Sequence, residues 1–350
     1  MRTLEWDSEK KGLRVIDQRA LPAQLNFVVL KDYLQVSQAI RNMILRGAPV
    51  IGVAAAYGLL LSALNSTASD LTNLKLEIHE AAVVLLQSRP TAVNLHWAIQ
   101  RMMQIVKDFK GNLDDLKVKM REEANAIAEE DIQTNLAIAR NGAQLIYEGD
   151  TIIHHCNTGA LATVDWGTAL GVIRMAYEQG KHLHVLVDET RPRLQGSRLT
   201  AWELIQYQIP FEIITDNAAG FFLKKGIANK VLFGADRVAR NGDVANKVGS
   251  YMLALAANAN HVPVYCVFPT TSIDLSLENG DQIPIEERDA DEVLDIQLHH
   301  EQVVPAGARA RNPAFDITPH ELISAYVTEV GVIRPPFAEN LASAMKHLRS

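Results

Sequence analysis

The sequence is poor in cysteine, with only Cys156 and Cys266 among its 350 residues. Two cysteines cannot build the disulfide framework that stabilises small secreted domains, so we expect a reducing compartment. The first eighteen residues, MRTLEWDSEKKGLRVIDQ, are charged throughout and lack the apolar stretch of a signal peptide. Both observations favour a cytoplasmic location.

The sequence also lacks an excess of basic residues and a long apolar span. Lys and Arg number 34 against 41 Asp and Glu, which gives a net charge of -7. Nucleic-acid binding needs clustered positive charge, so no such partner is expected. The most apolar stretch, residues 48–64, is rich in Ala and Gly and has Pro49 near its start. It is short for a membrane span and is expected to be a buried core helix.

Several nucleotide and metal motifs are missing. The chain has no G-x-G-x-x-G fingerprint, no P-loop, no G-x-S-x-G elbow and no H-E-x-x-H pair. His154, His155 and Cys156 form a short cluster, but alternate residues of a strand face opposite sides, so only His154 and Cys156 would share one. Without a second ligand cluster, we expect neither a metal nor a cofactor.

What is present is a change of pattern near residue 150. The first half has a strand region at 13–29 and then helical spacing, whereas later apolar, β-branched runs alternate with helices, as in a parallel sheet built of βαβ units. We therefore expect an α/β fold with a mostly helical N-terminal domain at 1–125 and a catalytic domain at 148–350. The expected helices are 33–45, 70–87, 91–109, a charged linking helix at 112–147, 166–179 and 245–259; the expected strands are 151–156, 182–189, 211–215, 230–236 and 262–269.

Ligands of parallel sheets bind beyond the carboxyl ends of the strands. The segments that follow the expected strands are therefore the candidates: residues 156–158, 188–190, 216–217 and 234–236. Residues 276–296 are acidic and rich in turns, which predicts an exposed loop and leaves open whether it acts as a lid.

Cys156 and Asp236 are the two candidates for chemistry. From the sequence, Cys156 could fill the core, bind a metal, act as a nucleophile or touch a substrate briefly. Asp236 follows a buried strand between apolar neighbours, and desolvation there would raise its pKa toward that of a general acid. It could instead cap the next turn or pair with Arg237.

Three further segments have residues typical of a phosphate-binding site. Asn246 and Lys247 are expected to open a helix whose dipole favours an anion. Arg46 and Gly47 precede Ala48 and Pro49 at another expected helix start, where backbone N–H groups and a guanidinium can bind phosphate together. Arg89, followed by Pro90 and Thr91, repeats this pattern. Together they indicate a small phosphorylated ligand.

Several of these segments together resemble methylthioribose-1-phosphate isomerases of methionine salvage. The matching segments are RGAPVIGVAAAYG, SRPTAVNL, HCNTGALAT, DETRPRLQGSRLTAWEL, TDNAAG, GADRVARNGDVANKVGSY, VPVYCVFPTTSID and RPPF. The resemblance implies a Rossmann-like C-terminal domain, a homodimer, and no metal or nucleotide. It implies that Asp236 is the proton donor and that Cys156 assists the transition state. The substrate-binding positions that it implies are Arg46, Gly47, Ala48, Arg89, Gln195, Asn246 and Lys247.

The implied reaction is an aldose–ketose isomerisation. Because phosphate blocks the anomeric carbon, the ring must open by acid assistance before hydrogen moves from C2 to C1, either as a proton or as a hydride. The same resemblance extends to ribose-1,5-bisphosphate isomerases and to non-catalytic regulatory subunits of a translation-initiation exchange factor. Both remain alternatives from the sequence.

Overall fold

The computed structural model describes residues 1–90 and 92–347, and their contacts divide the chain into two compact units. Unit 1 is Met1–Ala139 with Thr158–Gly171, and unit 2 is Arg140–Asn157 with the chain from Val172 onward. Each unit is described by itself. The boundaries expected from the sequence, 1–125 and 148–350, stay a prediction.

Unit 1 begins with a small antiparallel sheet. Its strands β1 (Leu4–Asp7), β2 (Gly12–Ile16) and β3 (Phe27–Leu30) pair in that order. The strand region expected at 13–29 is therefore two strands, β2 and β3, and Pro22 lies in the segment that separates them. The sheet contributes Leu4, Leu13 and Val15 to the core of unit 1.

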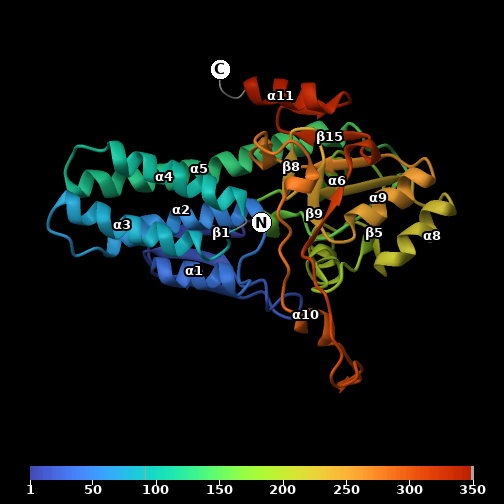
Figure 1. The fold of residues 1–350 in the computed structure, drawn as a ribbon, viewed down its shortest axis with the longest axis horizontal. Helices are drawn as coiled ribbons and strands as arrows, with labels where there is room; N and C mark the ends of the chain where they lie inside the picture. The colour runs from blue at the N-terminus through green and yellow to red at the C-terminus, as the bar shows by residue number, and fades with distance from the viewer. Residues whose placement is uncertain (91, 348–350) are drawn as a thin grey trace. The chain divides into compact units, whose positions relative to one another are not determined.

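Five helices complete the core of unit 1: α1 (Tyr33–Arg41), α2 (Ala48–Asn65), α3 (Leu71–Leu86), α4 (Val93–Asp108) and α5 (Leu113–Ala143), whose last four residues belong to unit 2 (Figure 1). Asp32 and Asp70 cap α1 and α3 through their side chains. The first of these helices ends four residues earlier than expected, because the chain turns at Met43 with φ +59°. The fourth was expected to begin at Thr91, which lies outside the described residues.

Helix α2 lies in the middle of this core, as the sequence predicted. It is the one described helix that is long and apolar enough to cross a membrane by length and composition, yet 78% of that stretch is buried inside the protein. Pro49 lies in its first turn, where the missing N–H removes no helical hydrogen bond. Its apolar surface is therefore covered by protein, mainly by α1, α3 and α4.

Unit 2 is built on a seven-stranded sheet in the order β16-β15-β10-β7-β4-β5-β6. Six neighbouring strands are parallel and β16 alone is antiparallel, which confirms the predicted fold class. All five strands predicted in this half are present. The strands are β4 (Thr151–His154), β5 (His184–Asp188), β6 (Phe211–Ile214), β7 (Lys230–Gly234), β10 (Val264–Val267), β15 (Ala325–Thr328) and β16 (Gly331–Ile333).

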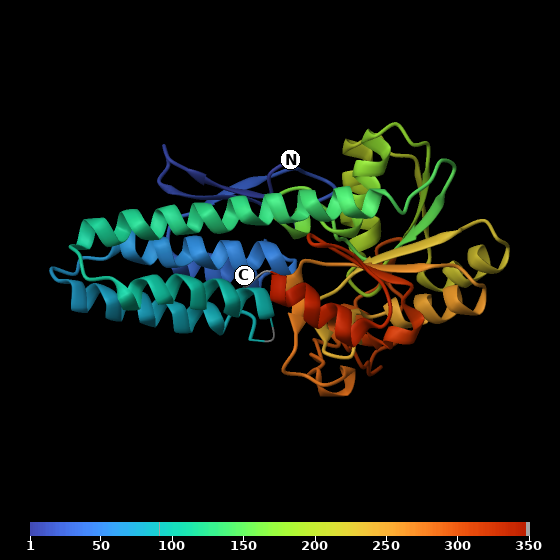
Figure 2. The same cartoon turned by 90° about the horizontal axis from the view of Figure 1, so that it is seen from above.

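Helices lie on both sides of this sheet (Figure 2). They are α6 (Ala169–Glu178), α7 (Ala201–Gln206), α8 (Ala219–Lys224), α9 (Ser250–Ala259) and α11 (Phe337–His347). Phe233, Cys266 and Tyr326 are fully buried beneath them. Cys266 is therefore a core residue, as its position in an apolar run indicated.

A second sheet of unit 2 was not predicted. Strands β8 (Arg237–Ala239), β9 (Val244–Lys247), β11 (Ile273–Asp274) and β14 (Phe315–Thr318) form it in the order β11-β8-β9-β14. The helix expected at 245–259 was wrong at its start, because residues 245–247 pair with β14, Ala245 also pairs with β8, and the helix begins only at Ser250. Gly249, with φ +106°, makes the turn between strand and helix.

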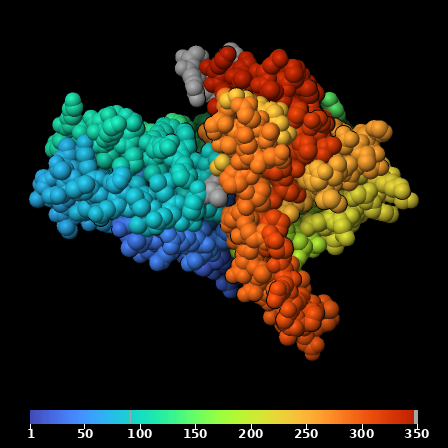
Figure 3. Space-filling model, in the orientation of Figure 1, coloured from blue at the N-terminus to red at the C-terminus, as the bar shows by residue number. Residues whose placement is uncertain are grey.

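The acidic segment 276–296 is largely irregular and exposed, with a 3₁₀ turn at Gly280–Gln282 and the short helix α10 (Asp291–Leu294). Ion pairs from Arg288 and Arg193 to Glu292 fasten it. Beyond it, β12 (Gln297–Leu298) and β13 (Glu301–Gln302) form an exposed hairpin that projects from the rest of unit 2 (Figure 3).

Candidate active site

Cys156 lies two residues beyond β4 and is half-buried. Its backbone has φ +66°, in the left-handed region that favours glycine. The backbone N–H donates to the Thr190 hydroxyl at 2.9 Å, and the carbonyl accepts from the Thr200 hydroxyl at 2.7 Å. The thiol is therefore carried on a peptide that is held on both sides.

The carboxyl ends of three strands meet here. The Asp216 carboxylate, after β6, accepts from the backbone N–H groups of Thr190 and Arg191 at 2.7 Å each, after β5. Thr190 in turn accepts from Cys156, after β4. Three of the four segments singled out by the strand-end rule are thus joined by hydrogen bonds within unit 2.

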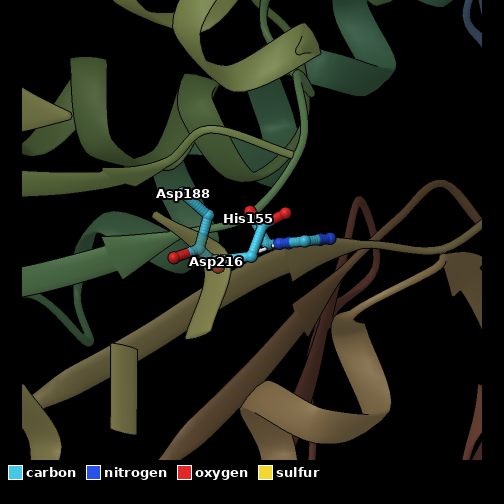
Figure 4. Close-up of side chains that lie close together, drawn as sticks. All are labelled: His155, Asp188 and Asp216. Atoms are coloured by element: carbon cyan, nitrogen blue, oxygen red, sulfur yellow. Dashed lines mark hydrogen bonds and ion pairs between the residues drawn. The ribbon is translucent and has the colours of Figure 1, made fainter. Parts of the chain in front are cut away.

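His155 and Asp188 form a buried pair beneath this edge (Figure 4). The His155 Nδ1 atom lies 2.9 Å from Asp188 Oδ2, and Nε2 lies 3.0 Å from the carbonyl of Val248. A carbonyl only accepts, so Nε2 carries a proton. Although burial opposes a charge, the hydrogen bond to Asp188 and the negative charges of Asp188 and Asp216 raise the pKa of His155.

This cluster has the residue types of a metal site, since ligand atoms of His155, Asp188 and Asp216 lie within 4.8 Å of one another. Two of the three residues already make hydrogen bonds through these atoms. Nε2 of His155 points its proton at a carbonyl, and both oxygens of Asp216 accept backbone N–H groups. Asp188 Oδ1 has no hydrogen-bond partner among the described residues, but the bonds made by His155 and Asp216 tie the three strand ends together.

His154, the neighbouring residue of β4, is fully buried. Burial, together with the charge of His155, lowers the pKa of His154 to about 3, so its imidazole is neutral. The sequence grouped His154 with Cys156 on one strand face. The strand ends at His154, however, and the left-handed turn at Cys156 breaks the alternation on which that grouping depended.

Asp236 follows β7, the strand next to β4 in the sheet. His154 of β4 pairs with Leu232 of β7. Cys156 comes two residues after His154, and Asp236 comes four residues after Leu232. Asp236 is half-buried and its backbone N–H donates to Ala245. Burial raises the pKa of the Cys266 thiol, and the nearby charge of Asp236 raises it further.

The other predicted site residues of unit 2 are Gln195, Asn246 and Lys247, and they differ in their hydrogen bonds. Gln195 is almost fully buried, and its side-chain oxygen has no hydrogen-bond partner among the described residues. Asn246 donates to the Ser250 hydroxyl at 2.7 Å, and the Lys247 ammonium donates to the carbonyl of Ala314 at 2.7 Å. Gln195 therefore has one buried acceptor that is not satisfied by the described residues, while hydrogen bonds hold Asn246 and Lys247 in place.

One electrostatic prediction was wrong. Asn246 and Lys247 end strand β9 and do not open a helix. The N-terminus of the helix that follows, α9, is already occupied by the Asp316 carboxylate, which accepts from the N–H groups of Gly249 and Tyr251 at 2.7 and 3.2 Å. Any anion that these two side chains bind is held by their own donors, not by the dipole of α9.

The remaining predicted residues belong to unit 1. Arg46 donates through Nε to Gln18 at 3.0 Å, and Gln18 donates to the carbonyl of Leu161 at 2.7 Å. Gly47 precedes α2 as its N-cap and Ala48 is the first residue of the helix, as expected. Unit 1 thus brings Arg46, Gly47 and Ala48 together at one helix start.

Arg89 also lies in unit 1, after α3, where its guanidinium is 3.5 Å from the sulfur of Met43. Met43 precedes Arg46 by three residues, so Arg89 contacts the segment that leads to α2. Cys156, Gln195, Asp236, Asn246 and Lys247 belong to unit 2.

Sequence reasoning missed Thr200 and the pairing of His155 with Asp188. Asp188 and Thr190 carried a signal because they end a predicted strand. No sequence pattern pointed to Thr200, because it lies in a π-helical turn, Gly196–Thr200. Hydrophobic periodicity does not reveal such a turn.

Comparisons with known proteins identify the family of this chain. The model of the initiation factor 2 subunit family matches residues 45–335. A protein of Pseudothermotoga lettingae named methylthioribose-1-phosphate isomerase 2 is 51% identical over 340 residues, covering 97% of each chain. A methylthioribose-1-phosphate isomerase of Geobacter metallireducens is 49% identical over 346 residues, covering 99% of each.

Two solved structures are similar over nearly the whole chain. The crystal structure of 5-methylthioribose 1-phosphate isomerase from Pyrococcus horikoshii OT3 has a TM-score of 0.92 at 40% identity, covering 99% of this chain and 96% of that one. A structure from A. fulgidus, described as translation initiation factor eIF-2B, subunit delta, has a TM-score of 0.87 at 39% identity and covers 99% of both. The chain belongs to the initiation factor 2 subunit family and is an enzyme of its isomerase branch.

Proposed function

We propose that this chain converts 5-methylthioribose 1-phosphate to 5-methylthioribulose 1-phosphate in methionine salvage. The observation that carries the proposal is the placement of a thiol and a carboxyl group, Cys156 and Asp236, at the carboxyl ends of the adjacent parallel strands β4 and β7. The names of relatives about half identical over the full length supply the substrate.

The chemistry assigns a task to each group. Protonated Asp236 donates its proton to the ring oxygen as the C1–O bond breaks, which opens the sugar while the phosphate stays on C1. Hydrogen then moves from C2 to C1, and the C2 hydroxyl gives its proton to the Asp236 carboxylate as the ketone forms, which restores the acid. Cys156 accepts the C2 proton and returns it at C1, or excludes water while a hydride shifts. No external oxidant or reductant is needed on either route.

Substrate binding is proposed for seven further residues, four of them in unit 1 and three in unit 2. Arg46, Arg89 and Lys247 supply positive charge for the phosphate, and Asn246 supplies an amide. The unpartnered oxygen of buried Gln195 is suited to accept a hydrogen bond from a sugar hydroxyl. Gly47 and Ala48 place backbone N–H groups at the start of α2.

Two substitutions test the assignment of the reacting groups. We expect Asp236→Asn and Cys156→Ser each to lower kcat by about 10²–10⁴ on 5-methylthioribose 1-phosphate, because each removes a proton-transfer group and keeps the shape of the side chain. Circular dichroism and denaturant unfolding would confirm that the variants are folded. A folded variant with wild-type kcat would show that its residue has another role.

The substrate and the alternatives are tested on the wild-type protein. Ribose 1,5-bisphosphate carries a second phosphate where the proposed substrate has a methylthio group, so we expect no comparable turnover of it. Binding of sugar phosphate without any turnover would favour the regulatory-subunit alternative. Product formed in D₂O tests for the proton route. Deuterium enters C1 when the proton on Cys156 exchanges with solvent before it is returned, whereas a hydride shift places none there.

We further propose that the enzyme is a cytoplasmic homodimer. Both cysteines are outside disulfides, as a reducing compartment requires. Light scattering on the purified protein should give twice the chain mass of 38.6 kDa.

A further inference from the structure

The backbone of Cys156 is an outlier at the proposed site. A residue with a Cβ atom rarely adopts φ +66°, because the left-handed region brings Cβ close to the following carbonyl oxygen. Glycine would adopt this conformation without that cost but would carry no thiol. A side chain held in such a conformation at a reacting position indicates that the surroundings impose its direction.

Two buried hydroxyl groups hold the peptide on either side of Cys156. Thr190 Oγ1 accepts the Cys156 N–H at 2.9 Å and donates to the carbonyl of Asp188 at 3.0 Å. Thr200 Oγ1 donates to the Cys156 carbonyl at 2.7 Å and accepts from Asn157 Nδ2 at 3.1 Å. Both threonines have no exposed surface.

The direction of every bond in this arrangement is fixed. A hydroxyl has one proton, and each threonine gives its proton to a carbonyl that can only accept. The remaining contacts are N–H groups, from the Cys156 backbone and from Asn157 Nδ2, that can only donate. Water has no access to either hydroxyl and could not replace them without a change of packing.

The protein positions the two threonines from opposite directions. The Thr190 N–H donates to Asp216 Oδ1 at 2.7 Å, which fixes the turn after β5. Thr200 ends the π-helical turn that begins at Gly196. A Cβ atom at Gly196 would lie 1.7 Å from the carbonyl oxygen of Asp188, so only glycine lets this turn approach the end of β5. Such π-turns occur frequently at functional sites.

We propose that Thr190 and Thr200 are positioning residues that hold Cys156 in its left-handed conformation and so direct its thiol to the reacting carbon. The proposal rests on the proposed isomerisation, in which Cys156 acts on C2 and C1. In this proposal neither threonine hydroxyl contacts the substrate. Their effect is transmitted through the Cys156 peptide alone.

The experiment compares valine and serine at each position in the full-length enzyme. Valine keeps the branched shape and loses the hydroxyl, whereas serine keeps the hydroxyl. Thr328→Val is the matched control, because Thr328 is also fully buried in unit 2 and donates to a carbonyl, that of Gly331 at 3.1 Å, on a strand three places from β4. Each variant is measured for kcat, KM and the pH profile of alkylation by iodoacetamide, which reaches half-buried Cys156 and not fully buried Cys266.

We expect Thr190→Val and Thr200→Val each to lower kcat by about 10–100-fold with KM changed by less than about threefold, since a thiol displaced by about 1 Å loses its alignment. Their alkylation profiles should shift, and Thr190→Ser, Thr200→Ser and Thr328→Val should match the wild type in both measurements. A folded valine variant with wild-type kcat and an unchanged alkylation profile overturns the proposal.

Two further readouts keep the outcome decisive. If a valine variant does not fold, alanine at the same position removes the same hydroxyl without added bulk, and wild-type kcat in that variant overturns the proposal. If the wild type does not turn over 5-methylthioribose 1-phosphate, the proposed function fails, and the alkylation profiles still test the positioning by themselves. Identical profiles for valine and serine would then overturn it.

Discussion

Two segments of this protein place an unusual backbone conformation at a proposed functional position, and they do so by different means. Gly47, before α2 in unit 1, has φ +114°. Cys156, after β4 in unit 2, has φ +66°. Glycine adopts a positive φ without steric cost, whereas cysteine adopts it only at a cost in conformational energy.

The difference follows from what each position supplies. Gly47 offers only its backbone, and a Cβ atom there would lie 2.5 Å from the carbonyl oxygen of Ala162. In the proposed reaction Cys156 supplies a thiol, which glycine lacks, and two threonine hydroxyls bind its peptide. Where function requires a side chain, the conformational cost is offset by hydrogen bonds from neighbouring elements.

Gly47→Ala should have the largest effect on stability. The substitution places Cβ against the Ala162 carbonyl and adds a disfavoured backbone conformation, which together should cost about 3 kcal/mol or more in free energy of unfolding. Urea denaturation monitored by circular dichroism would measure it. Activity should fall as well, because Arg46 and Ala48 flank the altered residue.

Gly149→Ala is the control for this substitution. Gly149 also has a positive φ, +77°, but a Cβ atom there would meet nothing within 4 Å. It should therefore cost only the conformational part, about 1 kcal/mol. Equal losses for the two substitutions would mean that the close approach to Ala162 is not what requires glycine at position 47.

Acid should affect the two segments differently. Arg46 keeps its charge at every accessible pH, whereas His154 beside the Cys156 turn is buried and neutral, with its pKa lowered to about 3. The unfolded chain takes up a proton at His154 near its ordinary pKa of about 6.5, so its contribution to stability is present above that pH and is lost as the pH falls toward 3.

The measurement is the change in free energy of unfolding between pH 7.5 and pH 5, compared with His154→Leu. The wild type should lose roughly 2 kcal/mol more than the variant, because leucine removes the titrating group. Other buried acids titrate in both proteins and cancel in the difference. An equal loss in both would show that His154 is protonated in the folded protein as readily as in the unfolded one.

The sequence predicted the part of this site that depends on strand ends. Apolar β-branched runs located β4, β5, β6 and β7, and the strand-end rule then selected Cys156, Thr190, Asp216 and Asp236. The structure confirms these strand ends, because a parallel sheet places the carboxyl ends of its strands along one edge, and the roles of the four residues stay a prediction.

Features that depend on contacts distant in sequence were not predicted. Residues 245–247 were expected to open a helix, but pairing with β14, and of Ala245 with β8 as well, makes them a strand. Thr200 was not predicted because its position depends on a π-turn and on a glycine approaching β5. The left-handed turn at Cys156 was not predicted either, since nothing local favours a positive φ in a cysteine.

The smallest expected effect is also the sharpest test of the comparison. Cys156→Gly and Cys156→Ala both lack the thiol, so both should be inactive, and they differ only in the Cβ atom. In ordinary helix or strand positions alanine is the more stabilising of the two by roughly 0.5–1 kcal/mol. At φ +66° the order should reverse, with the glycine variant more stable by about 1 kcal/mol in urea denaturation. If alanine proves as stable as glycine, Cys156 does not bear the conformational cost that Gly47 avoids, and the two threonine hydroxyls have nothing to offset.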